Sequence, residues 1–319
     1  MTERRVTRNR ILNILRIAVS VVGLLIIVLA MDLEEVFRLL REMNWLFFLV
    51  ALLLFLSGSL VRAYRWGSLV WALGVPAAYW RLVDLYFVGA FFSLFLPTGV
   101  GGDAVKMYEL SREDHRAAPA ISSVLMDRFL GLFVLFALAL LALVFGHGLI
   151  ARQVRFLIAV IFLGCLIGAA LLLQRTWLET VGRRLGLDRL LGRIKILREL
   201  YESIYLYGSA ALLRAFAASL VWNLVLILGY YVLGLAVGID LSMWHYFLFV
   251  PVISALLLIP SVGGLGIREG GTVLLFTQVG ISESHALALA LAYDITLLIT
   301  GFIGAMLYLA QGVREARQE

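Results

Sequence analysis

Long apolar runs constrain this chain more than any other feature of its sequence. A helix needs roughly 20 apolar residues to cross the roughly 30 Å hydrocarbon core of a bilayer. With 62% hydrophobic and 15% charged residues, the 319-residue chain also has too few charges to cover a water-exposed surface. The sequence therefore predicts an all-α polytopic membrane protein that forms one integral membrane domain over residues 1–319. Six stretches are long enough to span: 11–30, 45–70, 118–146, 153–174, 216–238 and 283–310.

Two further apolar regions, 82–115 and 245–279, are each interrupted near the middle by a proline and paired glycines. Proline removes a backbone donor, and glycine weakens a helix interior, so both interruptions should break the helix. Non-helical backbone is tolerated at membrane depth only where protein or a water-filled cavity covers it. We therefore expect each region to form a re-entrant helical hairpin.

The two interruptions resemble each other. "LPTGVGGDAVKM" begins at Leu96, and "IPSVGGLGIRE", which begins at Ile259, restates it with one residue deleted. Each copy places one base, Lys106 or Arg268, at the same distance after its glycine pair. Chance explains such a match poorly. The match therefore predicts that the two regions are copies of one duplicated unit.

The surroundings of the two copies agree as well. Each hairpin lies between two full spans, and the following span carries an acid, Asp127 in one half and Asp294 in the other. The first repeat is therefore expected over 45–146, with hairpin 82–115. The second is expected over 216–310, with hairpin 245–279.

Loop charge predicts the orientation, because basic residues collect on the cytoplasmic side. The N-terminus carries several arginines, and segment 175–202 has seven bases against four acids. Loop 31–44 has four acids against two arginines, which places it outside. We expect a multi-pass protein of the cell (inner) membrane with both termini in the cytoplasm. Segment 175–202 reads as a cytoplasmic amphipathic connector that lies on the anionic leaflet, or as a plain solvated connector.

This topology places the first hairpin on the cytoplasmic side and the second on the outer side. Such an inverted-topology repeat usually brings its broken helices together near the midplane, where they form a substrate site in secondary transporters. Helix N-termini offer unpaired N–H groups and a positive dipole end to an anion. We expect Asp103 to cap the helix that follows the first glycine pair.

The candidate substrate-binding residues follow from this interpretation. Glycine backbone would donate to a phosphate, Lys106 and Arg268 would supply charge, and carboxylates would tune these bases or carry coupling protons. The alternative is that the breaks are plain kinks whose bases neutralise Asp103, Glu109 or Glu269. The candidates are Arg62, Arg65, Gly101, Gly102, Asp103, Lys106, Asp127, Arg128, Gly263, Gly264, Arg268, Glu269 and Asp294.

Intramembrane charges carry part of this argument. A charged side chain costs about 2.5–3.5 kcal/mol at the bilayer centre unless it is paired or hydrated. Arg62, Arg65 and Arg128 lie nearer the cytoplasmic ends of their spans, so topological anchoring is their alternative role. No phosphate-binding loop, hydrolase elbow or metal-ligand spacing occurs, and we expect no catalytic residue, metal, cofactor or nucleic-acid partner.

Four motifs together resemble a known family. "RAYRW" (62–66), "LPTGVGGDAVKMYELSR" (96–112), "MDRFLG" (126–131) and "PSVGGLGIREGG" (260–271) occur in the order found in the flippase-like transmembrane domain of lysylphosphatidylglycerol synthases. In full-length synthases this domain precedes a soluble domain that aminoacylates the lipid, and it moves the product to the outer leaflet. This chain ends nine residues after its last expected span. The resemblance therefore implies lipid translocation without synthesis.

The sequence thus predicts a flippase or translocase, not an enzyme, that moves an anionic phospholipid or isoprenoid-phosphate lipid between leaflets. One alternative is an integral-membrane enzyme that acts on a lipid phosphate. A second is a scaffold for lipid-modifying enzymes. The expected partners are an anionic lipid and the bilayer, while a homo-oligomer and a separate lipid-synthesising enzyme stay open.

Overall fold

The computed structural model describes residues 33–96, 101–145, 152–173, 205–259 and 261–316, together with 199, 202 and 203. Throughout this part of the chain the regular elements are helices and no strand occurs, which confirms the all-α prediction. Three predictions lie wholly or mainly outside the described residues: the span 11–30, the connector 175–202, and the conformation of residues 97–100 in the first break.

The described helices match the expected spans closely. Four of them, α3, α6, α11 and α14, are long and apolar enough to cross a membrane, and α7 coincides with the expected span 153–174. In chain order the helices are α2 (Leu33–Glu42), α3 (Trp45–Ala72), α4 (Tyr79–Phe95), α5 (Gly101–Asp114), α6 (Ala117–Phe145), α7 (Arg152–Leu173), α11 (Ser209–Ala236), α12 (Met243–Leu256), α13 (Ile267–Thr277) and α14 (Glu283–Ala316).

Large apolar side chains are exposed along the spanning helices. On α11 and α14 they form outward-facing rows in which many side chains are more than one-third exposed. In water such surfaces would aggregate, whereas lipid solvates them. The protein is therefore a multi-pass membrane protein. The rows include Leu213, Phe216, Val221, Leu224 and Leu228 on α11, and Leu298, Phe302, Met306 and Leu309 on α14.

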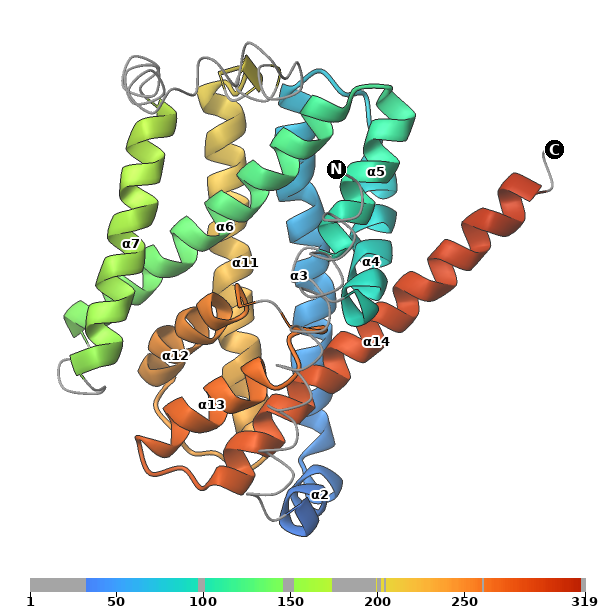
Figure 1. Ribbon diagram of the computed structural model, residues 1–319. Coiled ribbons are helices and arrows are strands. Elements are labelled where there is room, and N and C mark those ends of the chain that lie inside the picture. The colour runs from blue at the N-terminus through green and yellow to red at the C-terminus, as the bar shows by residue number, and fades with distance from the viewer. Residues whose placement is uncertain are drawn as a thin grey trace, which may run out of the picture.

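The antiparallel pair α3 and α11 forms the centre of the fold (Figure 1). Asn44 N, at the start of α3, donates to Ala236 O at the end of α11 over 2.8 Å. Farther along the pair, Gly58 lies directly against the Trp222 ring, where an added Cβ would come within 2.3 Å of a ring carbon. Small residues allow this close packing, which drives helix association in lipid.

Two helical hairpins approach the middle of the molecule from opposite ends. Helices α4 and α5 run lengthwise between one end and the middle, whereas α12 and α13 lie obliquely in the opposite half and are joined near the middle (Figure 1). Their tips meet there, since an added Cβ on Gly263 would lie 3.1 Å from Leu94 O near the end of α4.

Glycine conformation explains the second break. Gly263, Gly264 and Gly266 have φ of 61°, 85° and 80°, in the left-handed region that other residues rarely adopt. A new helix starts directly afterwards at Ile267, as α5 starts at Gly101 after the first break. The expected role of Asp103 as an N-cap is wrong: because α5 already begins at Gly101, Asp103 lies within its first turn.

Candidate functional site

A cavity of about 250 Å³ lies where the two hairpins meet. Gly102 of α5 and Gly263 and Gly264 of the second break all line it, so both breaks contribute to one site. Its charged lining among the described residues consists of four cations and one carboxylate: Arg62, Lys106, Arg128, Arg268 and Asp103. Cations thus outnumber carboxylates among the described lining side chains.

The first glycine pair lets α5 lie against α4. A Cβ on Gly102 would come within 2.0 Å of Gly89 O and 2.3 Å of Ser93 Oγ, so a larger residue would separate the helices. Gly102 N donates to Ser93 Oγ over 3.2 Å and does not point freely into the cavity. Gly101 packs instead against the Leu96 side chain. The pair therefore serves close packing as well as shaping the cavity wall.

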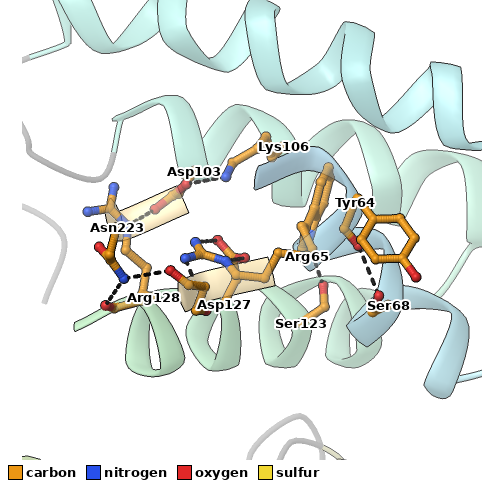
Figure 2. Close-up of polar contacts among 12 residues, drawn as sticks. Tyr64, Arg65, Ser68, Asp103, Lys106, Ser123, Asp127, Arg128 and Asn223 are labelled. Atoms are coloured by element: carbon orange, nitrogen blue, oxygen red, sulfur yellow. Dashed lines mark hydrogen bonds and ion pairs between the residues drawn. The ribbon is translucent and has the colours of Figure 1, made fainter. Parts of the chain in front are cut away.

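Asp103 links two of the cations (Figure 2). Its Oδ1 lies 2.6 Å from Lys106 Nζ, and its Oδ2 accepts a hydrogen bond from Arg128 Nε. Lys106 Nζ also lies 4.4 Å from the centre of the Tyr86 ring and 5.2 Å from that of Trp66. Lys106 therefore does pair with Asp103, as the kink alternative expects, but two cations share this one carboxylate.

Arg62 is the cation least compensated by the protein. Its guanidinium carbon lies 4.8 Å from the centre of the Tyr86 ring and 4.7 Å from that of Trp222. Its buried Nε has no hydrogen-bond partner within the described residues. Aromatic faces attract a cation but do not neutralise it, so Arg62 offers an uncommitted charge to an anion in the cavity.

In the second hairpin, Arg268 is buried and donates from both Nη atoms, whereas its buried Nε has no hydrogen-bond partner among the described residues. Its Nη1 donates to Asp294 Oδ1, and its Nη2 donates to Gly263 O over 3.2 Å. A Cβ on Gly264 would lie 2.7 Å from Nη2, so glycine makes room for the guanidinium. The acid bonded to Arg268 is thus Asp294 of α14, rather than its sequence neighbour Glu269.

Five predicted site residues lie outside the cavity lining: Gly101, which packs against Leu96, and Arg65, Asp127, Glu269 and Asp294. Arg65 and Asp127 form a bidentate ion pair between α3 and α6, with Nε–Oδ1 at 2.6 Å and Nη2–Oδ2 at 2.8 Å (Figure 2). Both side chains are almost completely buried, so the ion pair holds α3 and α6 together and does not face the cavity. Asp294 is linked to the cavity through its hydrogen bond with Arg268, and Glu269 interacts with both of these residues electrostatically.

Comparison with known proteins identifies the family. A family model described as the transmembrane region of lysylphosphatidylglycerol synthase matches residues 13–305. The chain belongs to this family. It is also similar to a UPF0104 membrane protein of Pyrococcus horikoshii, with 22% identity over 306 residues that cover 87% of this chain and 90% of the relative. These findings confirm the predicted resemblance and make the chain a membrane domain linked to lipid handling.

The matched family region contains every charged residue of the cavity. It also contains lining residues that sequence reasoning did not propose. Tyr86 and Trp222 flank Arg62, and Tyr293 lies beside Arg268 with its ring centre 5.4 Å from the guanidinium carbon. No sequence signal separated these aromatic residues from the many others in apolar helices.

Proposed function

We propose that this protein is a flippase or translocase that moves an anionic phospholipid or isoprenoid-phosphate lipid between leaflets, and that its cavity binds the headgroup. The observation that carries the proposal is the charge of the cavity: its described lining has four cations against one carboxylate, and Arg62 has aromatic rings but no acid bonded to it among the described residues. A lipid phosphate would compensate the excess. Arg presents planar pairs of N–H donors that match phosphate oxygens, and Lys adds a point charge.

The burial of these cations supports a bound anion. Lys106 and Arg268 are only 4% and 5% exposed. Buried intramembrane charges are costly and usually mark a substrate or ion pathway. A transport site fits this lining better than an enzyme site, because the described cavity lining holds one carboxylate, Asp103, and both its oxygens are already bonded to cations. A free general base is therefore absent from that part of the lining.

We further propose a topology of six spans and two re-entrant hairpins, with repeats over 45–146 and 216–310 and the connector 175–202 in the cytoplasm. Both termini are cytoplasmic, in a cell (inner) membrane. The position of the two hairpins in Figure 1 supports this arrangement, since one lies in the half of the molecule that holds the α3–α4 turn and the other in the half that holds α2. In an inverted repeat, the tips of the two hairpins are expected to meet near the bilayer midplane.

Single-cysteine labelling tests the topology. With Cys165 replaced, cysteines introduced at Glu35 and Ser282 should react with a membrane-impermeant maleimide from outside the cell. Cysteines at Arg116 and Arg189 should react only after the membrane is opened. The decisive comparison is Arg116 with Ser282, because these residues follow equivalent helices of the two hairpins. Labelling of both from one side would refute the inverted repeat.

The lipid-binding proposal is best tested at Arg62. Arg62→Met removes the charge without leaving a buried acid unpaired, so the fold should persist. Loss of charge-assisted hydrogen bonds costs about 1.5–3 kcal/mol, which corresponds to roughly tenfold to hundredfold weaker binding. Binding of purified protein to phosphatidylglycerol in nanodiscs would be measured, together with movement of the labelled lipid in phosphatidylcholine vesicles.

Arg116→Met is the matched control, because Arg116 is an exposed arginine in the turn between α5 and α6. It should bind and move lipid as the wild type does. Unchanged binding and transport by Arg62→Met would show that this cavity does not hold the headgroup. Equal binding of phosphatidylcholine by the wild type would contradict an anionic substrate.

A further inference from the structure

Arg268, Glu269 and Asp294 form a buried charge cluster beside the cavity. Arg268 and Glu269 begin α13, and Asp294 lies near the middle of the long helix α14. Arg268 bonds to one oxygen of Asp294 and also lines the cavity. Glu269 is 1% exposed, and both Arg268 and Asp294 act on it electrostatically. One cation thus faces two carboxyl groups.

The carboxyl oxygens of this cluster are poorly bonded. Glu269 Oε1, Glu269 Oε2 and Asp294 Oδ2 are buried, and no other side chain donates to them within the described residues. The Glu269 carboxyl interacts instead with its own backbone N–H and with the carboxyl of Asp294. Two buried carboxyl groups that lie together are costly to ionise at once. If both groups were ionised, the cluster would carry a net negative charge. A single proton shared between them would balance Arg268.

The groups that face this cluster come from several helices. Tyr293 of α14 and Tyr230 of α11 stack on each other with ring centres 4.4 Å apart, and both interact with Arg268 and Asp294. Arg62 of α3 acts on Tyr293 from the cavity side. The packed surfaces of α12 and α4 contribute apolar residues nearby, Leu256 against Gly271 and Leu94 against Gly301. None of these neighbours supplies a second cation bonded to the carboxyl pair among the described residues.

The other acids proposed from the sequence are differently placed. Asp127 is bonded through both oxygens to Arg65, and Asp103 is bonded through both oxygens to Lys106 and Arg128. Glu109 is more exposed and lies 3.5 Å from Arg81 Nη2, outside the cavity. The two hairpins therefore differ: the acid of the first is fully compensated, whereas the acids of the second share one arginine.

We propose that Glu269 and Asp294 form a proton-binding site that couples proton uptake to binding of a lipid phosphate at Arg268. This inference rests on the proposed function. A phosphate in the cavity competes with Asp294 for the Arg268 guanidinium. When the phosphate takes Arg268, Asp294 loses its counter-charge and binds a second proton from the aqueous side. The added phosphate monoanion and the added proton cancel, so the cluster stays neutral and one proton accompanies each lipid anion.

The coupling predicts a leaflet asymmetry in a pH gradient. Wild-type protein would be reconstituted in phosphatidylcholine vesicles with a trace of fluorescent phosphatidylglycerol, with the voltage clamped by potassium and valinomycin. A gradient of one pH unit should enrich the labelled lipid by up to about tenfold in the leaflet that faces the alkaline side, since proton and anion move together. Dithionite quenching measures the leaflet ratio, and an internal pH dye reports the protons.

Glu269→Gln should abolish the response to the gradient. The variant keeps the size and polarity of the side chain but cannot bind a proton, so the leaflet ratio should stay near one while lipid binding persists. Asp294→Asn should give the same loss. The matched control is Glu109→Gln, which removes a partly exposed carboxyl outside the cavity and should keep the tenfold asymmetry.

Two outcomes would overturn the proposal. The first is a full pH response from Glu269→Gln and Asp294→Asn. The second is wild-type protein that moves the lipid but shows neither asymmetry nor proton movement, a result that does not depend on whether any variant folds. In that case the transport function stands without proton coupling. If wild-type protein moves no lipid and binds none, the proposed function fails.

Discussion

Replacement of Asp127 by alanine is expected to lower the free energy of unfolding by about 3–5 kcal/mol, because it leaves the Arg65 guanidinium buried without a counter-charge. Arg65 is 4% exposed and Asp127 is 2% exposed, so water cannot solvate the remaining charge. The pair connects α3 to α6, and its loss should also loosen the packing between these two helices of the first repeat. Denaturant titration of the purified protein in detergent measures the change.

A double replacement tests whether the loss of stability comes from the unpaired charge that Asp127→Ala leaves behind. Arg65→Met combined with Asp127→Leu removes both charges and restores apolar volume, so most of the lost stability should return. Arg116→Ala is the exposed control and should cost no more than about 1 kcal/mol, since surface ion pairs contribute little. An Asp127→Ala protein as stable as the control would show that Arg65 finds another partner.

Replacement of Trp66 by alanine should cost about 3–5 kcal/mol, because it removes a large side chain from a packed core. Trp66 is fully buried, and its indole N–H donates to Ser123 Oγ over 3.0 Å. The ring also faces Lys106 at 5.2 Å from Nζ. We therefore expect weaker binding of phosphatidylglycerol in addition to lower stability, measured in the same detergent and nanodisc assays.

Two variants serve as controls for this effect. Trp66→Phe keeps most of the ring volume and the aromatic face toward Lys106, so it should retain more stability than alanine and most of the lipid binding. Trp45→Ala removes a tryptophan that is 59% exposed at the start of α3, and it should change little. Equal losses at Trp45 and Trp66 would point to a general effect of aromatic removal rather than to the core.

The sequence by itself determined the order of the elements. Spans 45–70, 118–146, 216–238 and 283–310 were recognisable because a membrane helix must be long and apolar. The starts of α5 and α13 were recognisable because a proline and a glycine pair interrupt each of the apolar regions 82–115 and 245–279, and glycine disfavours a helix interior. The repeated motif also predicted that both helix breaks contribute to one substrate site. Glycines of both breaks line the same cavity.

The tertiary structure alone decided which charges pair. Arg268 bonds to Asp294, which is distant in sequence, and not to the adjacent Glu269. Arg65 bonds to Asp127 outside the cavity. The tertiary structure also placed Arg62 between two aromatic rings from different helices. The physical reason is that lipid-facing and buried faces of a membrane helix are both apolar, so hydrophobic periodicity does not reveal how each helix is rotated. Only packing of small residues and pairing of buried charges between helices fixes that rotation, and with it the composition of the site.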